Sequence, residues 1–222
     1  MSDFKSAFIG NGLYCLSRLT GRTGRYQVSG IDHFHECRAA GRPVILAAWH
    51  GMTMMLASYF IGHFDPGSFV LLLPDDERGR NLSVWARKLG AHPFCLHLEG
   101  DSSLASARQL VNLVRLVKGG RDCYITPDGP DGPAYRIKPG VAYIAQKAQA
   151  AILPVGAYTR TGYRLNRWDQ YTIPRPFSRI ALVIGEPLQA PAGGEATALI
   201  GQLTAALHQV TAQAAANYYE MR

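Results

Sequence analysis

A histidine that follows an apolar run is the first residue of this sequence that could do chemistry. His50 comes directly after PVILAAW (residues 43–49) and precedes Gly51. If the run is a buried strand, His50 stands at its carboxyl end, where open α/β sheets bind their ligands. An imidazole has an ordinary pKa of about 6.5, so His50 is a candidate general base at neutral pH. The alternative is a core histidine whose hydrogen bonds are satisfied.

A second candidate is the stretch ITPDGPDGP (residues 125–133), which follows another apolar run. Its glycines and prolines predict a stiff, exposed loop that presents Asp128 and free backbone N–H groups. An ordinary succession of turns is the alternative, since Pro-Asp-Gly is a common turn signal. The unbroken length of the stretch, and Arg136, Lys138 and Gly140 behind it, favour a site.

The cysteines and the remaining histidines argue against disulfides and metals. Four cysteines are widely spaced and form no C-x-x-C pair: Cys15, Cys37, Cys95 and Cys123. Together with an N-terminus that lacks the signal-peptide pattern, this spacing predicts a protein of the reducing cytoplasm. His33, His35 and Cys37 alternate as at a metal corner, but no fourth ligand follows at a recognisable spacing. We therefore expect no bound metal.

The elements that must position these residues alternate between strands and helices. Five apolar, β-rich runs predict buried strands: residues 43–49, 68–73, 122–126, 151–158 and 180–184. Apolar residues recur on one face of residues 77–90 and 102–118, which predicts amphipathic helices, and an Ala-rich helix is expected over about 195–219. This alternation predicts an α/β fold with a mostly parallel sheet flanked by helices.

Length and charge narrow the class of protein. The chain has 222 residues, of which 47% are hydrophobic and 18% charged, so we expect a single domain with a sizeable core rather than a disordered tail or a disulfide-stapled miniprotein. Of the net charge of +7, residues 1–30 and residues 158–190 carry +3 each. Such basic segments suit a membrane surface, an acidic carrier protein or nucleic acid, or form an ordinary solubilising surface. No nucleic-acid-binding module is recognisable, and we expect no such partner.

Two segments have the composition of a membrane-associated helix or a membrane span. In residues 2–20, the large apolar residues can gather on one side of a helix, which suits a helix in a lipid interface or one packed on its own domain. Residues 43–64 contain no Asp, Glu, Lys or Arg and have about the 20 residues that a membrane span needs. His50 and Gly51 interrupt them, so a buried strand that leads into a helix explains them better.

Six segments, taken in order, resemble a known family. They are WHG (49–51), ITPDGP (125–130), KPGV (138–141), ILPVG (152–156), RWD (167–169), and PFSR through GEPL (176–188). Their order and spacing, from about Arg22 to Leu188, resemble a small bacterial branch of the lysophospholipid acyltransferase superfamily. The resemblance implies a glycerol-3-phosphate acyltransferase-like domain over residues 31–222, behind an amphipathic, membrane-facing helix and lead-in over residues 1–30.

The resemblance also implies a reaction. A fatty acyl group would pass from an acyl thioester, on acyl carrier protein or coenzyme A, to a hydroxyl or amine of a lysolipid-like or specialised lipid acceptor. His50 would be the general base, without a covalent acyl-enzyme, and the sequence has no G-x-S-x-G elbow. No bound cofactor is implied. The protein would work in the cytoplasm, peripheral to the inner face of the membrane, with acyl carrier protein and the membrane surface or its lipid as partners.

The site residues implied by the resemblance lie in and around these segments. Besides His50 and Asp128 as catalytic residues, the expected substrate-binding residues are Gly51, Ser102, Ser103, Gly129, Pro130, Gly132 and Arg136. Backbone N–H groups near Gly51 or in residues 128–133 would stabilise an oxyanion. The apolar residues after Gly51 would line an acyl-chain tunnel or form a plain core helix: Met52, Met54, Met55, Leu56 and Phe60.

The first departure from the superfamily pattern concerns the partner of His50. Most members have H-x-x-x-x-D, in which the Asp orients the His, but Met55 stands at that position here. A carboxylate partner must therefore come from elsewhere. Asp75, Asp76 and Asp128 are the candidates, and we favour Asp128 because its motif matches.

The second departure concerns the acceptor. Glu99 and Asp131 stand where the branch usually has arginines, and carboxylates oppose phosphate binding. We therefore expect an acceptor that no phosphate holds at that point. The two departures also leave room for a different class of protein, a non-catalytic lipid- or acyl-carrier-binding protein that retains the fold.

Overall fold

The computed structural model describes residues 2–96, 104–190 and 194–221, which are built around a seven-stranded sheet. The strands lie in the order β1 (Arg25–Ser29), β9 (Arg179–Ile184), β6 (Ala151–Tyr158), β2 (Val44–Ala47), β5 (Asp122–Ile125), β3 (Phe69–Pro74) and β4 (His92–Leu96). Neighbouring strands run parallel except β6 and β9, which are antiparallel. The predicted α/β fold with a mostly parallel sheet is confirmed.

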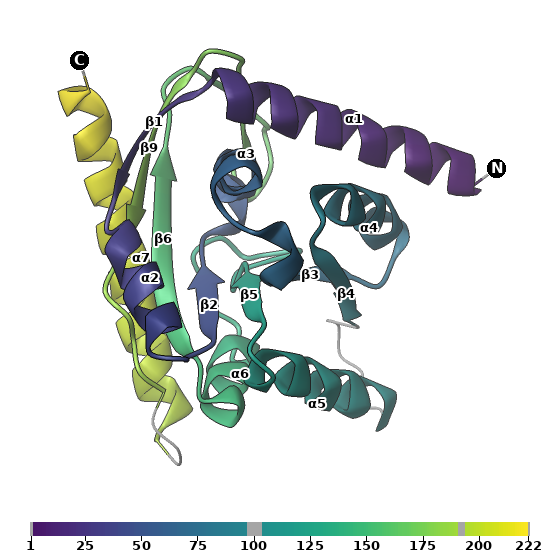
Figure 1. Cartoon of the computed structure of the whole chain (residues 1–222), viewed down its shortest axis with the longest axis vertical. Helices are drawn as coiled ribbons and strands as arrows, with labels where there is room; N and C mark the ends of the chain where they lie inside the picture. The colour runs from purple at the N-terminus through teal and green to yellow at the C-terminus, as the bar shows by residue number, and fades with distance from the viewer. Residues whose placement is uncertain (1, 97–103, 191–193, 222) are drawn as a thin grey trace.

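Helices cover both faces of this sheet (Figure 1). On one face lie α2 (Ile31–Ala39), α3 (Thr53–His63) and α4 (Glu77–Leu89), and on the other lie α5 (Leu104–Lys118), α6 (Gly140–Ala148) and α7 (Ala196–Glu220). Helix α1 (Ser2–Thr23) packs on α3 and α4 and so forms an outer layer on the first face.

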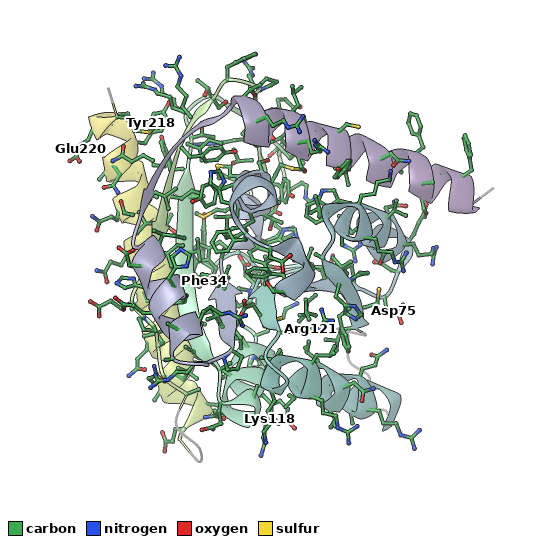
Figure 2. The ribbon with its side chains drawn as sticks, in the orientation of Figure 1. Phe34, Asp75, Lys118, Arg121, Tyr218 and Glu220 are labelled. Atoms are coloured by element: carbon green, nitrogen blue, oxygen red, sulfur yellow. The ribbon has the colours of Figure 1, made fainter. Side chains whose placement is uncertain are left out.

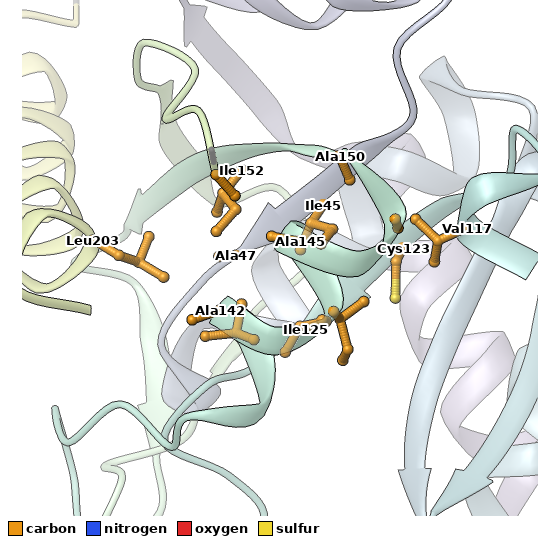
Figure 3. Packing of buried hydrophobic residues seen from close by; sticks show 14 of the residues in the cluster. Ile45, Ala47, Val117, Cys123, Ile125, Ala142, Ala145, Ala150, Ile152 and Leu203 are labelled. Atoms are coloured by element: carbon orange, nitrogen blue, oxygen red, sulfur yellow. The ribbon is translucent and has the colours of Figure 1, made fainter. Parts of the chain in front are cut away.

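Burial on both faces explains why the strand sequences are continuously apolar. In β2, Val44 and Leu46 face α2 and α3, whereas Ile45 and Ala47 face α6 and α7. All four side chains are fully buried. Figure 3 shows this second pair in one cluster with Ile152 of β6, Ala142 and Ala145 of α6, and Leu203 of α7. Parallel strands covered by helices on both sides need no polar alternation.

Residues 43–64 form a strand-to-helix junction, as the sequence favours. They comprise β2, a single 3-10 turn (His50–Met52) and α3. Within the described parts of the chain, no helix has both the length and the apolar character that crossing a membrane requires. The sequence pattern did not predict β1, α2, β4, α6 or the separate hairpin of β7 (Gly162–Arg164) and β8 (Thr172–Pro174). Most of these are short, and short elements carry too little periodicity to stand out.

The parallel pairing of β2 and β5 brings the two candidate segments together. Ala47 lies opposite Ile125 in this pair. His50 follows β2, and residues 126–133 follow β5, so both leave the sheet at its carboxyl edge. Lys118 and Arg121 mark the opposite edge, just before β5 begins (Figure 2).

A buried carboxylate sits at that opposite edge. Asp122, the first residue of β5, is fully buried. Its Oδ1 accepts hydrogen bonds from the backbone N–H of Val44 at 3.1 Å and from the Arg38 guanidinium at 3.3 Å, and its Oδ2 has no partner among the described residues. Burial raises the pKa of this carboxyl to about 6, against the opposing effects of Val44 and Arg38. The ionised form is therefore costly here.

We expect this ionisation to make stability depend on pH. The pKa of Asp122 is about 6 in the folded chain, against an ordinary value of 3.8. The stabilising contribution of its protonated carboxyl to folding is therefore fully present below about pH 4 and is lost as the pH rises through about 6. Asp122→Asn keeps an oxygen for Val44 but cannot ionise. The free energy of unfolding of the wild type relative to this variant should fall by up to about 2 kcal/mol between about pH 4 and pH 7. Urea denaturation measures this difference, and a value that stays constant with pH would contradict the expectation.

Candidate active site

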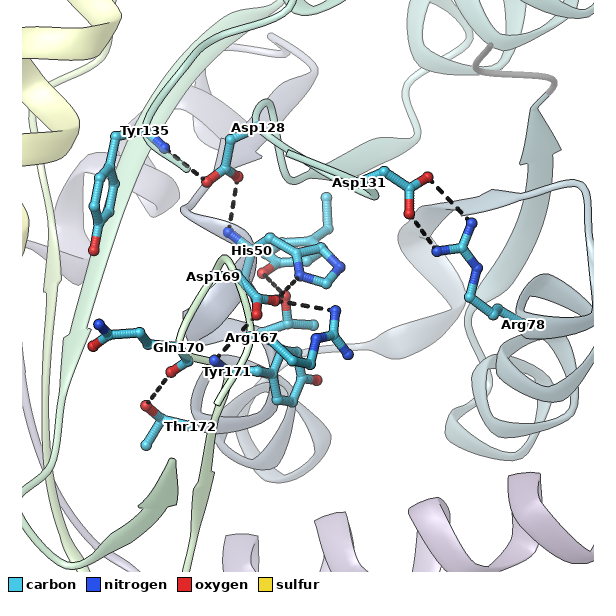
Figure 4. Close-up of polar contacts among 12 residues, drawn as sticks. His50, Arg78, Asp128, Asp131, Tyr135, Arg167, Asp169, Gln170, Tyr171 and Thr172 are labelled. Carbon is cyan, nitrogen blue, oxygen red and sulfur yellow. Dashed lines mark hydrogen bonds and ion pairs between the residues drawn. The ribbon is translucent and has the colours of Figure 1, made fainter. Parts of the chain in front are cut away.

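The imidazole of His50 is bonded to a carboxylate from a distant part of the chain. His50 Nδ1 lies 2.6 Å from Oδ2 of Asp169, in the loop between β7 and β8 (Figure 4). The Asp169 side chain is fully buried, and that of His50 is 21% exposed. Because an ionised carboxylate only accepts hydrogen bonds, the imidazole proton resides on Nδ1. Nε2 then keeps a free lone pair, which is what a general base needs.

The loop that carries Asp169 also surrounds the imidazole. The backbone N–H of Tyr171 donates to Asp169 Oδ1 at 3.3 Å, and Arg167 lies 3.4 Å from Oδ2. The rings of Trp168 and Tyr171 flank the His50 ring at centroid distances of 5.5 and 5.6 Å. Burial, with a smaller contribution from Asp169, raises the pKa of the Tyr171 phenol, so this side chain stays neutral. The ring of His50 is therefore fixed on several sides.

Gly51 makes this close approach possible. A Cβ at this position would lie 2.1 Å from the backbone carbonyl oxygen of Asp169. A backbone atom cannot rotate away, so a side chain at position 51 would push the loop and its carboxylate off the imidazole. Packing against the Asp169 loop therefore requires a glycine at position 51, and Gly51 has no side chain that could bind a substrate.

The glycines of residues 125–133 pack against the same group of rings. A Cβ at Gly129 would lie 2.7 Å from Cδ2 of His50. A Cβ at Gly132, which has a positive φ of 79°, would lie 2.8 Å from the Trp168 ring. The unbroken turn sequence of this loop therefore reflects its contact with His50 and Trp168.

Asp169 takes the place that the sequence analysis gave to Asp128. The Asp128 carboxylate accepts hydrogen bonds from the backbone N–H groups of His50 at 2.9 Å and Tyr135 at 3.3 Å, not from the imidazole. Burial raises the pKa of Asp128, and these two backbone N–H groups act against that rise. Asp128 thus ties the loop after β5 to the turn that carries His50. It holds the backbone, while Asp169 holds the ring.

The other candidate partners of His50 and several expected substrate-binding residues do not lie together with the imidazole. Asp76 caps α4 by accepting from the Gly79 N–H at 3.0 Å, and Asp75 is exposed. Arg136 is also exposed and does not line the cavity beside His50 described below. The expected substrate-binding residues Ser102 and Ser103 lie outside the described residues. Among the described residues, no group of three or more His, Cys, Asp or Glu side chains is placed to hold a metal.

His50 opens onto a large, mostly apolar cavity. Its volume is about 770 Å³, and apolar side chains of α1, α3, β3 and α4 supply most of its wall. This volume lies within the range of small-molecule sites. Of the residues considered for a tunnel, Met54 and Phe60 line the cavity, whereas Met52, Met55 and Leu56 do not. Gly129 and Pro130 line it beside His50, and Gly51 does not.

Similarity to known proteins supports the fold of the chain and does not test the residues of this site. No family model matches the chain. An uncharacterised protein of Rickettsia prowazekii is 32% identical over 145 residues, which are 65% of this chain and span 63% of that protein's length. The crystal structure of the 1-acyl-sn-glycerophosphate (LPA) acyltransferase PlsC from Thermotoga maritima matches with a TM-score of 0.58 at 16% identity, over 90% of this chain and 79% of that one.

The chain has the fold of this acyltransferase. Met55, which stands five residues after His50 where most of the superfamily has an Asp, belongs to α3, and its side chain is buried in the core. The carboxylate on His50 comes instead from 119 residues further along the chain. The sequence signal for Asp169 is the RWD segment (167–169). The family resemblance includes this segment but assigns no role to its aspartate. Sequence reasoning missed Asp169 for that reason.

Asp131 is paired with an arginine that the sequence analysis did not connect with it. Arg78, at the start of α4, donates to Asp131 from Nη1 at 2.6 Å and from Nη2 at 3.2 Å, and to Asp76 from Nε at 2.6 Å. Hydrogen bonding to Arg78 lowers the pKa of Asp131. A guanidinium therefore does stand at this part of the cavity wall, but two carboxylates already engage it.

We expect Gly51→Ala to break the bond between His50 and Asp169. The added methyl group would destabilise the protein by about 1–3 kcal/mol, as overpacking does elsewhere, and displace the Asp169 loop. Urea denaturation measures the first effect, and the low-field proton signal of His50 Nδ1–H in the NMR spectrum, lost in the variant, reports the second.

The matched control is Gly201→Ala on α7, where a Cβ meets no atom within 4 Å. This variant should gain about 0.5–1 kcal/mol from reduced backbone entropy of the unfolded chain and keep the low-field signal. A Gly51→Ala protein with the stability and the signal of the wild type would contradict the packing argument.

Proposed function

We propose that this protein transfers a fatty acyl group from an acyl thioester to a hydroxyl or amine of a lysolipid-like or specialised lipid acceptor. The donor is acyl carrier protein or coenzyme A. The observation that carries the proposal is the pair of His50 and Asp169, 2.6 Å apart, at the wall of an apolar cavity of about 770 Å³. The fold shared with the Thermotoga maritima acyltransferase supports the reaction class.

The geometry of the pair suits general base catalysis. Nε2 of His50 takes the proton of the acceptor O–H or N–H while that oxygen or nitrogen attacks the thioester carbonyl carbon. Asp169 stabilises the imidazolium that forms. Backbone N–H groups near Gly51 or in residues 128–133 stabilise the negative charge on the former carbonyl oxygen. The C–S bond then breaks, the thiolate takes the proton from His50, and the acylated acceptor and a free thiol leave.

The cavity suits the acyl chain. Its wall is mostly apolar, and the rings of Phe60, Phe64 and Phe69 pack on one another within it, with centroid distances of 4.9–6.2 Å. Such a wall favours a hydrocarbon chain by removing it from water, at about 0.8 kcal/mol per buried CH₂ group. Cationic side chains of Lys138 and Arg167 line the same cavity and suit the polar ends of the substrates.

The arrangement around Arg78 supports one choice of acceptor. Because Asp76 and Asp131 engage its guanidinium, a substrate phosphate would have to displace a carboxylate to bind there. This supports an acceptor held by a group other than a phosphate at this point, such as an amino lipid or a sugar lipid. A screen of acceptors with purified protein tests this choice, and a clear preference for lysophosphatidate would overturn it without touching the proposed reaction.

We expect transfer to depend on both members of the pair. Acyl thioester should release free thiol only when an acceptor is present, and His50→Ala should abolish that release. Asp169→Asn should lower kcat by about 10²–10⁴-fold and leave KM near the wild-type value, because it changes proton transfer more than binding. The measurement is thiol release, together with mass spectrometry of the acylated product.

His92→Ala, an exposed histidine on β4, is the matched control and should keep wild-type activity. A thermal melt confirms that each variant is folded. Wild-type rates in folded His50→Ala would overturn the role of this pair. A wild-type protein that binds thioester or lipid but never releases thiol would favour the non-catalytic binding protein instead.

A further inference from the structure

The cavity beside His50 reaches both faces of the central sheet. Side chains of β3 alternate between the faces, so that Leu71 and Leu73 pack with α4, whereas Leu72 packs with the cluster that contains α5 and α6. All three of these leucines line the cavity. Figure 1 shows α4 and α5 on opposite sides of β3 and β4. The apolar wall of the cavity therefore belongs to two separate layers of the fold.

We call the two parts of the cavity the α4 arm and the α5 arm. The α4 arm lies between the sheet and the helices α1, α3 and α4, and the α5 arm lies between the sheet and the helices α5 and α6. Residues that line the α4 arm include Leu13, Ala57, Phe60, Leu71, Leu73 and Leu82. Residues that line the α5 arm include Leu72, Leu96, Leu110, Val141 and Ile144. Each arm thus offers an apolar wall of its own.

The two arms are joined where two neighbouring strands stop pairing. β3 and β5 form only three residue pairs, which end at Leu71 opposite Tyr124. Beyond Leu71, β3 pairs with β4 alone as far as Pro74. Pro74 and Thr126, at the carboxyl ends of β3 and β5, line the cavity, as does His50 after the neighbouring strand β2. The arms therefore meet beside the imidazole.

The cavity is larger than one acyl chain needs. A methylene group fills about as much space as a water molecule, whose share of the liquid volume is about 30 Å³. A chain of about 16 carbons then fills roughly 480 Å³. The cavity volume is about 770 Å³. The difference, roughly 290 Å³, is enough for a second and shorter chain.

A cation stands beside each arm. Lys138 comes two residues before α6, whose Val141 and Ile144 line the α5 arm. Arg167 lies on the loop between β7 and β8, and β8 packs on α3, which forms part of the α4 arm. Both cations line the cavity. The polar ends of two separate chains can therefore meet one cation each.

We propose that this site binds two hydrocarbon chains at once, with the transferred acyl group in the α4 arm and a chain of the acceptor in the α5 arm. The α4 arm takes the acyl group because it supplies most of the apolar wall. This inference rests on the proposed function, and it makes the acceptor a lipid whose own chain is held inside the protein. Both polar ends then lie where the arms meet, at His50.

The length of the acceptor's chain should control the rate in the wild-type protein. For acceptors with one head group, kcat/KM should rise about fourfold for each added CH₂ group until the α5 arm is full. Leu110→Trp places a larger side chain in that arm, so the rise should end at a shorter acceptor while the preference among acyl donors stays unchanged. Thiol release, followed below the critical micelle concentration of each lipid, measures both series.

Two matched variants make the same substitution elsewhere. Leu82→Trp fills part of the α4 arm, so it should shorten the preferred acyl donor and leave the preference among acceptors unchanged. Leu116→Trp changes a half-buried residue of α5 that does not line the cavity, and it should match the wild type in both series. Thermal melts check that all three variants are folded.

Native mass spectrometry with laurate counts bound chains without any turnover. The wild type and Leu116→Trp should bind two laurate molecules, and Leu110→Trp and Leu82→Trp should bind one. The wild-type count keeps the proposal testable even where a variant does not fold. Two bound chains in a protein that releases no thiol would support the two chain sites and overturn the proposed reaction alone.

Three results would overturn the proposal. One is a single laurate molecule in the wild type that both arm variants lose, which would mean that one bent chain spans the two arms. Another is an acceptor without a hydrocarbon chain that reacts as fast as its long-chain analogue. The third is a Leu110→Trp protein in which the preference among donors changes and the preference among acceptors does not.

Discussion

The hydrogen bond between a buried carboxylate and an imidazole joins two distant parts of this structure. The Asp169 side chain is fully buried, and His50, Arg167 and the Tyr171 backbone N–H lie within hydrogen-bond distance of its carboxylate oxygens. These groups come from the turn after β2 and from the loop of a small hairpin outside the main sheet. The hairpin has three residue pairs of its own, and the hydrogen bond with His50 ties its loop to the turn after β2.

Backbone packing makes that contact possible. Gly51 lets the carbonyl group of Asp169 approach, and Gly129 lets the loop after β5 lie against the imidazole. The two carboxylates hold different parts of His50: Asp128 accepts a hydrogen bond from its backbone N–H, and Asp169 is bonded to its ring. A turn held from both sides keeps one tautomer and one ring orientation. Such preorganisation is what a base needs when it acts on a bound substrate.

Helix α1 connects this site with the surface. Its small residues allow a close crossing of α3 and α4, its inner apolar residues close the cavity, and its large outer residues remain exposed. The same helix therefore separates the cavity from the exposed side chains on its outer side. Phe177, whose backbone N–H is bonded to the last residue of this helix, is 76% exposed and has a positive φ of 63°.

The sequence by itself determined the main strands, the longer helices and the fold class, and it marked His50 and the loop after β5 as candidates for a site. Continuous apolar runs report burial on both faces of a sheet, and turn residues report a tight loop, so both signals are local. Short elements such as β4, β7 and β8 carry too few residues for that signal. Only the tertiary structure decided which carboxylate meets the imidazole and which face of α1 is buried. Both depend on contacts between residues far apart in the chain, such as the 119 positions between His50 and Asp169, which no local pattern records.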